Sequence, residues 1–78
     1  MNKLKLIDAK KGRDYYVEEI KVSDDFIKLR LKKLGFIKNQ KVKLLNSNYG
    51  KSSYLVSVMD IKYALDKGIC DEIIVKDE

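Results

Sequence analysis

The sequence has 78 residues, of which 45% are hydrophobic, and its formal net charge is +5. A chain of this length allows one domain with one small core. It contains neither the run of about 18 apolar residues that a membrane span needs nor a signal sequence at its N-terminus. We therefore expect a single domain over residues 1–78, in the cytoplasm and without membrane insertion. The single cysteine, Cys70, cannot form an internal disulfide and is expected in the core.

The positive charge comes almost entirely from lysine, because Arg13 and Arg30 are the only arginines. Arginine makes the bidentate and stacking contacts that favour nucleic-acid recognition, whereas dispersed lysine is typical of a well-solvated surface. The charge therefore favours a soluble surface. Binding of RNA or single-stranded DNA by a small basic barrel stays open as the alternative.

The N-terminal part predicts an apolar cluster, a turn and a strand. Residues 4–7 form the cluster, and Gly12 marks the turn because glycine tolerates a positive φ. Residues 14–21 are rich in β-forming side chains, but the apolar ones do not alternate strictly. A bulge near Glu18 and Glu19 would reconcile the pattern with a strand.

A helix is predicted next, and its start is well marked. Ser23 can cap the N-terminus, and Asp24 and Asp25 fall in the first turn, where the helix dipole favours negative charge. Val22 can pack on Ile27 as a hydrophobic staple. We therefore expect the helix to begin at Ser23.

The apolar side chains of this helix fall on one narrow stripe at about 100° per residue. The stripe consists of Ile27, Leu31 and Leu34, with Phe26 and Arg30 at its borders. The arc away from the stripe carries Lys28, Leu29, Lys32 and Lys33. Leu29 is an apolar residue ringed by lysines, which is typical either of an anchor for a partner protein or of an ordinary exposed leucine.

Two further features of the helix concern Arg30 and the C-terminal end. The stem of Arg30 is expected to cover the edge of the core with its charge in water, and a buried ion pair with a barrel carboxylate is the alternative. Gly35 stands where a left-handed residue usually ends a helix, and Phe36 can then pack back on Leu31. The helix is expected to end at Gly35.

A strand and a loop should follow. Residues 41–45 alternate lysine with apolar residues, which predicts a half-buried strand with Val42 and Leu44 pointing inward. Residues 46–53 have the composition of a loop and are expected to be the most mobile stretch.

The C-terminal third predicts three short strands and one helical turn. Residues 54–59 and 61–65 are so close that only Met59 and Asp60 can turn between them, which implies a tight hairpin. Residues 66–71 suit a single helical turn, and residues 73–75 read as a last strand.

About five short strands, one helix and a short C-terminal helical turn indicate a mainly β chain. Closing a sheet hides its edges, so a small, partly open barrel is the expected architecture. Both SH3-like and OB-type barrels fit this pattern.

Four motifs follow one another along the chain: Gly12-x-x-Tyr15-Tyr16-Val17-x-x-Ile20, Arg30-Leu31-x-x-Leu34-Gly35-Phe36, Ala64-Leu65 and Cys70-x-x-Ile73-x-Val75. The most specific motif is the second, which ends the helix. Taken in this order, the motifs resemble the FeoA family, the small accessory proteins of bacterial ferrous iron transport. The sequence is also similar to the C-terminal SH3-like domain of DtxR-type metal-dependent repressors.

The resemblance implies an SH3-like barrel that acts in the cytoplasm on FeoB, a membrane permease with a GTP-binding domain. Such a protein modulates its partner and is not an enzyme. We expect no cofactor, no nucleic-acid partner and a monomer or weak oligomer. The arc formed by Lys28, Leu29, Lys32 and Lys33 is the predicted partner-binding site.

The chemistry of the side chains agrees with a non-catalytic role. The chain has no histidine, no glycine-rich phosphate loop and no base beside its only thiol, so we predict no catalytic residue. A ferrous site prefers histidine with carboxylate, so we predict no metal site formed by this chain alone. The five tyrosines are expected mostly in the barrel core, and a stacking platform for single-stranded nucleic acid is the alternative.

Overall fold

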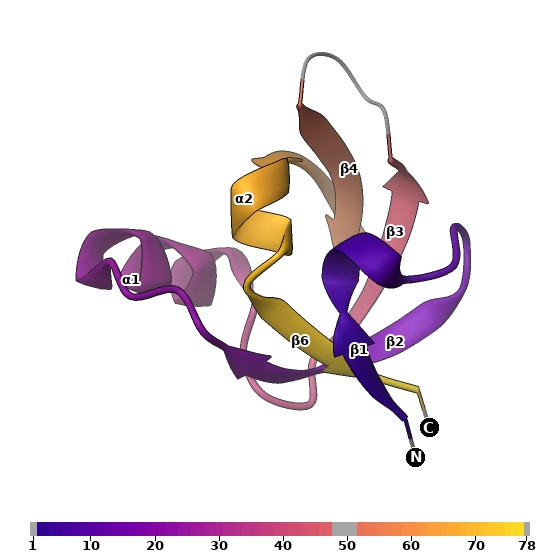
Figure 1. Cartoon of the computed structure of the whole chain (residues 1–78), viewed down its shortest axis with the longest axis horizontal. Coiled ribbons are helices and arrows are strands. Elements are labelled where there is room, and N and C mark those ends of the chain that lie inside the picture. Colours follow the sequence, from indigo (N-terminus) through magenta and orange to yellow (C-terminus); the bar gives the residue numbers. More distant parts are fainter. Residues whose placement is uncertain (1, 48–51, 78) are drawn as a thin grey trace.

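A computed structural model describes residues 2–47 and 52–77 of the chain. Six strands form one antiparallel sheet in the order β1-β6-β2-β3-β4-β5. The strands are β1 (Lys3–Lys5), β2 (Asp14–Ile20), β3 (Lys41–Asn46), β4 (Ser53–Val58), β5 (Ile61–Asp66) and β6 (Ile73–Lys76). The helical elements are η1 (Leu6–Asp8, a 3-10 turn), α1 (Asp25–Leu34) and the single turn α2 (Lys67–Cys70). The sheet curves round a core and α1 lies to one side of it (Figure 1), which confirms a mainly β fold.

The sheet has one strand more than the sequence predicted. Residues 4–7 were interpreted as an apolar cluster, but Lys3–Lys5 pair with β6 and only then does the chain enter η1. A three-residue strand has a single inward side chain, here Leu4, so it shows no alternation. Its pairing depends on β6, which is distant in sequence.

The bulge predicted in β2 is confirmed. The pairing of β2 with β6 changes register between Val17 and Glu19. A second register change lies between Leu44 and Asn46 in β3, opposite β4, and the sequence did not predict it. Bulges of this kind bend strands and increase the twist, and thereby let a six-stranded sheet curl round a small core.

The core fills the space inside the curled sheet. Val42 and Leu44 are buried as predicted. The other buried hydrophobic residues are Leu6, Ala9, Tyr15, Val17, Val22, Leu31, Phe36, Val56, Val58, Leu65, Cys70, Ile73 and Val75. Cys70 is fully buried, and burial, with a smaller contribution from the Asp66 carboxylate, raises the pKa of its thiol to about 12. Cys70 is therefore an inert core residue, as expected.

Tyrosines line the core more than they cover the surface. Tyr15 is buried, and its hydroxyl accepts a hydrogen bond from the backbone N–H of Lys10 at 3.0 Å. Tyr63 is half-buried, with its ring 6.4 Å from that of Phe36. Tyr49 lies outside the described residues. Tyr15 and Tyr63 thus fit the prediction of tyrosines in the core.

The start of α1 differs from the prediction. Asp24, and not Ser23, is the cap: its carboxylate accepts hydrogen bonds from the backbone N–H groups of Phe26 at 2.9 Å and Ile27 at 3.3 Å. Both residues are good caps by type, but the carboxylate of Asp24 also places a full negative charge at the positive end of the helix dipole. The helix consequently begins one residue later than the Ser23 cap implied.

The end of α1 is as predicted. Gly35 has φ 110° and ψ 3°, in the left-handed region. The N–H of Gly35 donates to the carbonyl of Lys32 at 3.1 Å, and the N–H of Phe36 donates to the carbonyl of Leu31 at 2.9 Å. This pair of bonds is the Schellman motif, which turns the chain and drives Phe36 into the core.

The remaining connections follow the predicted order. Met59 and Asp60 both have positive φ, 52° and 63°, as expected of a two-residue type I′ hairpin between β4 and β5. Of the predicted loop 46–53, Asn46 ends β3 and Ser53 begins β4, while residues 48–51 lie outside the described residues, so their predicted mobility is not tested.

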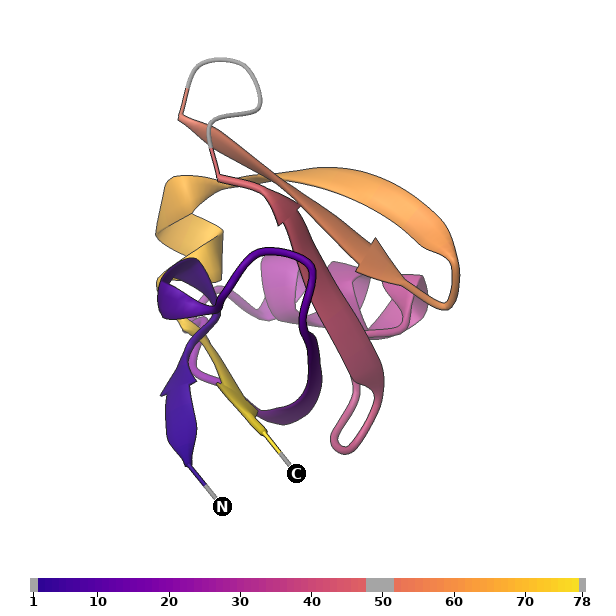
Figure 2. The same cartoon turned by 90° about the vertical axis from the view of Figure 1, so that its right-hand side faces the viewer.

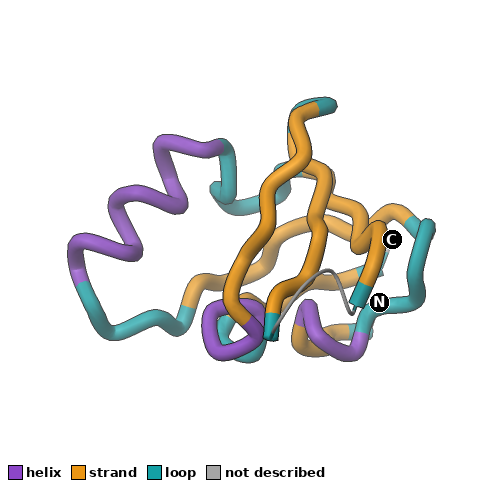
Figure 3. Tube along the Cα trace, turned by 90° about the horizontal axis from the view of Figure 1, so that it is seen from above, coloured by secondary structure: helices purple, strands orange, loops and turns teal. Residues whose placement is uncertain are grey.

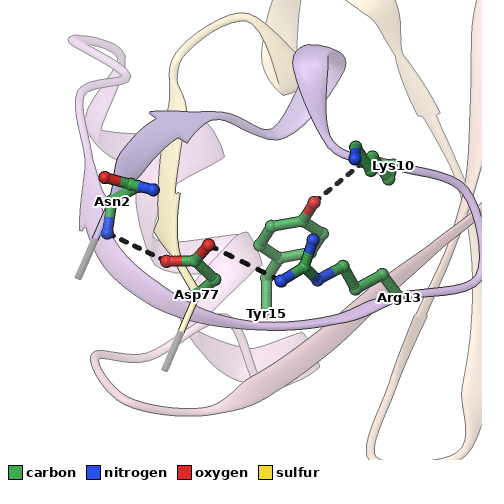
Figure 4. A network of polar contacts seen from close by, with 5 residues as sticks. All are labelled: Asn2, Lys10, Arg13, Tyr15 and Asp77. Atoms are coloured by element: carbon green, nitrogen blue, oxygen red, sulfur yellow. Dashed lines mark hydrogen bonds and ion pairs between the residues drawn. The ribbon is translucent and has the colours of Figure 1, made fainter.

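The two ends of the chain meet beside β2 (Figure 4). The backbone N–H of Asn2 donates to one carboxylate oxygen of Asp77 at 2.9 Å, and the guanidinium of Arg13 lies 3.8 Å from the other. Arg13 also lies over the ring of Tyr15, 5.9 Å from its centroid. These contacts join the N-terminal edge of the sheet to its last strand.

The carboxylate of Glu18, at the β2 bulge, forms ion pairs with two lysines. It lies 3.3 Å from the ammonium of Lys3 and 3.2 Å from that of Lys76. The hydrogen bonds from Lys76 and then Lys3 hold the pKa of Glu18 below its ordinary value of 4.5. A lowered pKa means that the ionised carboxylate stabilises the fold above the unfolded pKa, and that this stabilisation is lost as the pH falls through the folded pKa.

We therefore predict that Glu18→Gln lowers the melting temperature at neutral pH and that the difference from wild type shrinks as the pH falls through the lowered pKa of Glu18. Thermal melts across a pH series measure both. Glu19→Gln is the matched control, because Glu19 is exposed and no described residue forms an ion pair with it. A difference that stays constant down to low pH would contradict an ionic origin.

Candidate partner-binding surface on α1

Helix α1 is attached to the barrel mainly along one face. Leu31 is buried, and Ile27 and Leu34 are half-buried and pack against the core, as the predicted stripe requires. The first turn of the helix is the part farthest from the sheet (Figure 3), and the chain then runs back toward the barrel. The outward side chains of α1, Phe26, Leu29 and Lys33 among them, are exposed.

The structure places the predicted partner-binding residues as follows. Leu29 is 51% exposed, and Lys32 and Lys33 are exposed. Lys28 is half-buried, and together with the exposed Lys32 it lines a cavity of about 300 Å³ between α1 and β2. The helical wheel placed Lys28 on the outward arc because it assumes that the helix contacts the barrel only through the apolar stripe. In the structure, β2 also approaches the helix from a second side.

Phe26 is the main residue that the sequence analysis misplaced. It was expected at the border of the buried stripe, but its side chain is 87% exposed. Phe26 lies in the first turn, three residues before Leu29, so the two side chains are neighbours on the helix surface. The periodicity itself indicates this, because at about 100° per residue Phe26 lies about 80° outside the stripe and close to Lys33.

Phe26, Leu29, Lys32 and Lys33 form one outward surface, which we call the α1 patch. An exposed phenylalanine beside an exposed leucine is unusual on a small domain, and contiguous apolar surface of this kind marks interaction sites. No ion pair among the described residues neutralises Lys32 or Lys33. The patch thus combines an apolar centre with a positive rim.

Arg30 takes neither a buried nor a paired position. It is exposed, and no carboxylate among the described residues lies within ion-pair distance of it. The residue lines a second cavity, of about 330 Å³, between α1 and β5. Its stem therefore covers the edge of the core with its charge in water, and the alternative of a buried ion pair is wrong.

Several acidic side chains have structural partners. Asp24 caps α1, Glu18 binds two lysines, and Asp71 lies 3.2 Å from the ammonium of Lys5. Within residues 2–47 and 52–77, no three His, Cys, Asp or Glu side chains gather in an arrangement that could hold a metal ion. No helix of the described chain is long and apolar enough to cross a bilayer.

The chain is similar to known proteins at two levels. A family model described as the FeoA domain matches residues 4–77. A search of curated proteins finds no match.

Solved structures give the second level of similarity. FeoA from Stenotrophomonas maltophilia, complexed with zinc, is 25% identical, with a TM-score of 0.80 over 94% of this chain and 89% of that one. It is described as a prokaryotic SH3 domain protein and a candidate activating factor of bacterial ferrous iron transport. An iron uptake regulatory protein, also FeoA, is 18% identical, with a TM-score of 0.81 and 97% of both chains covered. A manganese-dependent transcriptional repressor is 14% identical, with a TM-score of 0.86, and here 97% of this chain matches 42% of the repressor.

Proposed function

Since the chain belongs to the FeoA domain family, we propose that it is a cytoplasmic accessory protein of ferrous iron uptake and that it binds the FeoB membrane GTPase. The observation that carries the proposal is the family match over nearly the whole chain. The likeness to the S. maltophilia protein supports the same process. Without a set of catalytic side chains in the sequence, binding is the means by which the protein acts.

The α1 patch, together with Lys28, is the proposed contact with FeoB. Interfaces of this kind have an apolar centre and a polar rim, and complementary charge speeds encounter. The patch therefore fits a surface on the cytosolic GTP-binding domain that has an apolar socket and an acidic rim. Phe26 and Leu29 enter the socket, and Lys32 and Lys33 face the rim.

The proposal is tested by binding the purified chain to FeoB from the same genome, with the rate of GTP hydrolysis measured in parallel. We expect saturable binding and a changed hydrolysis rate. Binding to the cytosolic domain should survive moderate salt, because its centre is apolar. If FeoB in detergent neither binds the chain nor changes its rate, the proposed function is wrong.

Measuring the affinity at several salt concentrations distinguishes the alternative, nucleic-acid binding, from binding to FeoB. Affinity for single-stranded DNA or RNA falls steeply and linearly in log salt because bound phosphates release counterions. A stacking platform made of tyrosines would also need their rings to be exposed, and Tyr15 is in the core with its hydroxyl bonded. Tight binding to a single strand with that salt dependence would favour the alternative.

A further inference from the structure

We propose that the chain self-associates through β5, which pairs antiparallel with β5 of a second copy in a register centred on Ala64. This inference goes beyond the proposed function and does not depend on it. The unpaired edge of β5, the charges along that edge and a groove beside it each support the pairing.

Strand β5 is the open edge of the sheet. It is last in the strand order and pairs only with β4, over six residue pairs without a change of register. Figure 2 shows β5 along the rim of the sheet. Proteins usually blunt such edges with proline, a bulge or a very short strand. The chain has no proline, and the other edge strand, β1, is only three residues long with lysine at both ends.

The hairpin turn determines which backbone groups of β5 are free. In a two-residue turn, the flanking residues Val58 and Ile61 form a hydrogen-bonded pair. Bonding then alternates, so Ile61, Tyr63 and Leu65 direct their backbone groups toward β4. Lys62 and Ala64 direct theirs outward, away from the sheet.

These outward groups have no partner in the described structure. Within residues 2–47 and 52–77, no backbone or side-chain group outside β4 is hydrogen-bonded to the N–H or C=O of Lys62 or Ala64. The N–H of Asp66 also points outward by the same alternation. A strand laid along this edge would therefore find free donors and acceptors at the spacing of a β ladder.

The charges along β5 favour pairing with a second copy of the strand, and they favour one register of that pairing. A two-fold pairing centred on Lys62 places that lysine opposite its own copy. A pairing centred on Tyr63 places Asp60 opposite Asp66 of the other copy. A pairing centred on Ala64 places Lys62 opposite Asp66 of the second copy, twice by symmetry, and opposite charges facing across strands are favourable.

The side chains on both faces suit the same register. On the outer face, Ala64 meets its own copy, and its small side chain allows the strands to approach. The edge of β5, from Tyr63 to Asp66, adjoins the 330 Å³ cavity between α1 and β5, whose apolar lining includes Ile27, Leu34 and Tyr63. With Ala64 at the centre, Tyr63 of the second copy faces Leu65 at this groove and covers apolar side chains that the single chain leaves half-exposed.

The test is sedimentation of the purified chain over a wide concentration range, with amide hydrogen exchange at each end of the range. We expect a weak dimer in the wild type and slower exchange at Lys62 and Ala64 as the dimer forms. Lys62→Glu and Asp66→Lys should each weaken the dimer by about tenfold or more, because two attractive pairs become repulsive. The double reversal should restore the dimer. Lys11→Glu, an equal charge change on an exposed turn, is the control.

Ala64→Pro tests the backbone pairing separately. Proline removes only the outward N–H, so the ladder between β4 and β5 is kept while the dimer is lost. A wild type that stays monomeric overturns the proposal. So does a dimer that tolerates Ala64→Pro or that the double reversal fails to restore. Protection of Lys62 and Ala64 only when FeoB is added would show an extended segment of that partner on the edge instead, and would also overturn it.

Discussion

Gly35→Val is expected to destabilise the protein by at least about 2 kcal/mol, which lowers the melting temperature by roughly 10 °C for a domain of this size. Gly35 has φ 110°, a conformation in which a β-branched residue is strained. A Cβ there would also lie 2.9 Å from the sulfur of Met59 and 3.4 Å from a methyl carbon of Val58. Thermal or urea unfolding followed by circular dichroism gives the measurement.

Two other glycines, Gly12 and Gly68, provide controls that separate strain from crowding. Gly12 has φ 81°, but no atom lies within 4 Å of an added Cβ, so Gly12→Ala should cost only the backbone strain, about 1 kcal/mol. Gly68 has an ordinary φ and open space, so Gly68→Ala should be neutral or slightly stabilising. A Gly35→Val protein that melts with the wild type would show that α1 does not end in a left-handed residue.

Local signals explain which parts of the fold could be predicted. The end of α1 depends on Gly35 and Phe36, which act within two turns of the helix, and the hairpin depends on the two residues between its strands. Both are confirmed. The bulge near Glu18 could be predicted because it disturbs the alternation of β2 itself.

The parts that could not be predicted depend on contacts between distant segments. β1 is a strand only because β6 lies beside it, and the bulge in β3 is set by β4. The same holds at the candidate site for the partial burial of Lys28, which follows from the approach of β2 to a second side of α1.

The largest effect on binding is expected from changes at the centre of the α1 patch. Leu29→Asp and Phe26→Asp should each weaken association with the cytosolic domain of FeoB by about 100-fold or more, since a charge is placed in an apolar socket. Neither change should lower stability by more than about 0.5 kcal/mol, because both side chains are exposed. An aspartate at position 26 also falls in the first turn, where the helix dipole favours it.

A change at the rim should act differently, and this contrast is the sharper test. Lys32→Glu should mainly slow association, by about tenfold at low salt, and leave the dissociation rate nearly unchanged, because rim charges govern encounter while a central anchor governs release. Lys11→Glu carries the same charge change away from the patch and serves as the control. Binding kinetics beside melting curves provide the measurement.

If Leu29→Asp unfolds the protein while Phe26→Asp does not, Leu29 is part of the core. If both variants fold and bind normally, FeoB docks elsewhere, on the loop 46–53 or on an open edge of the barrel.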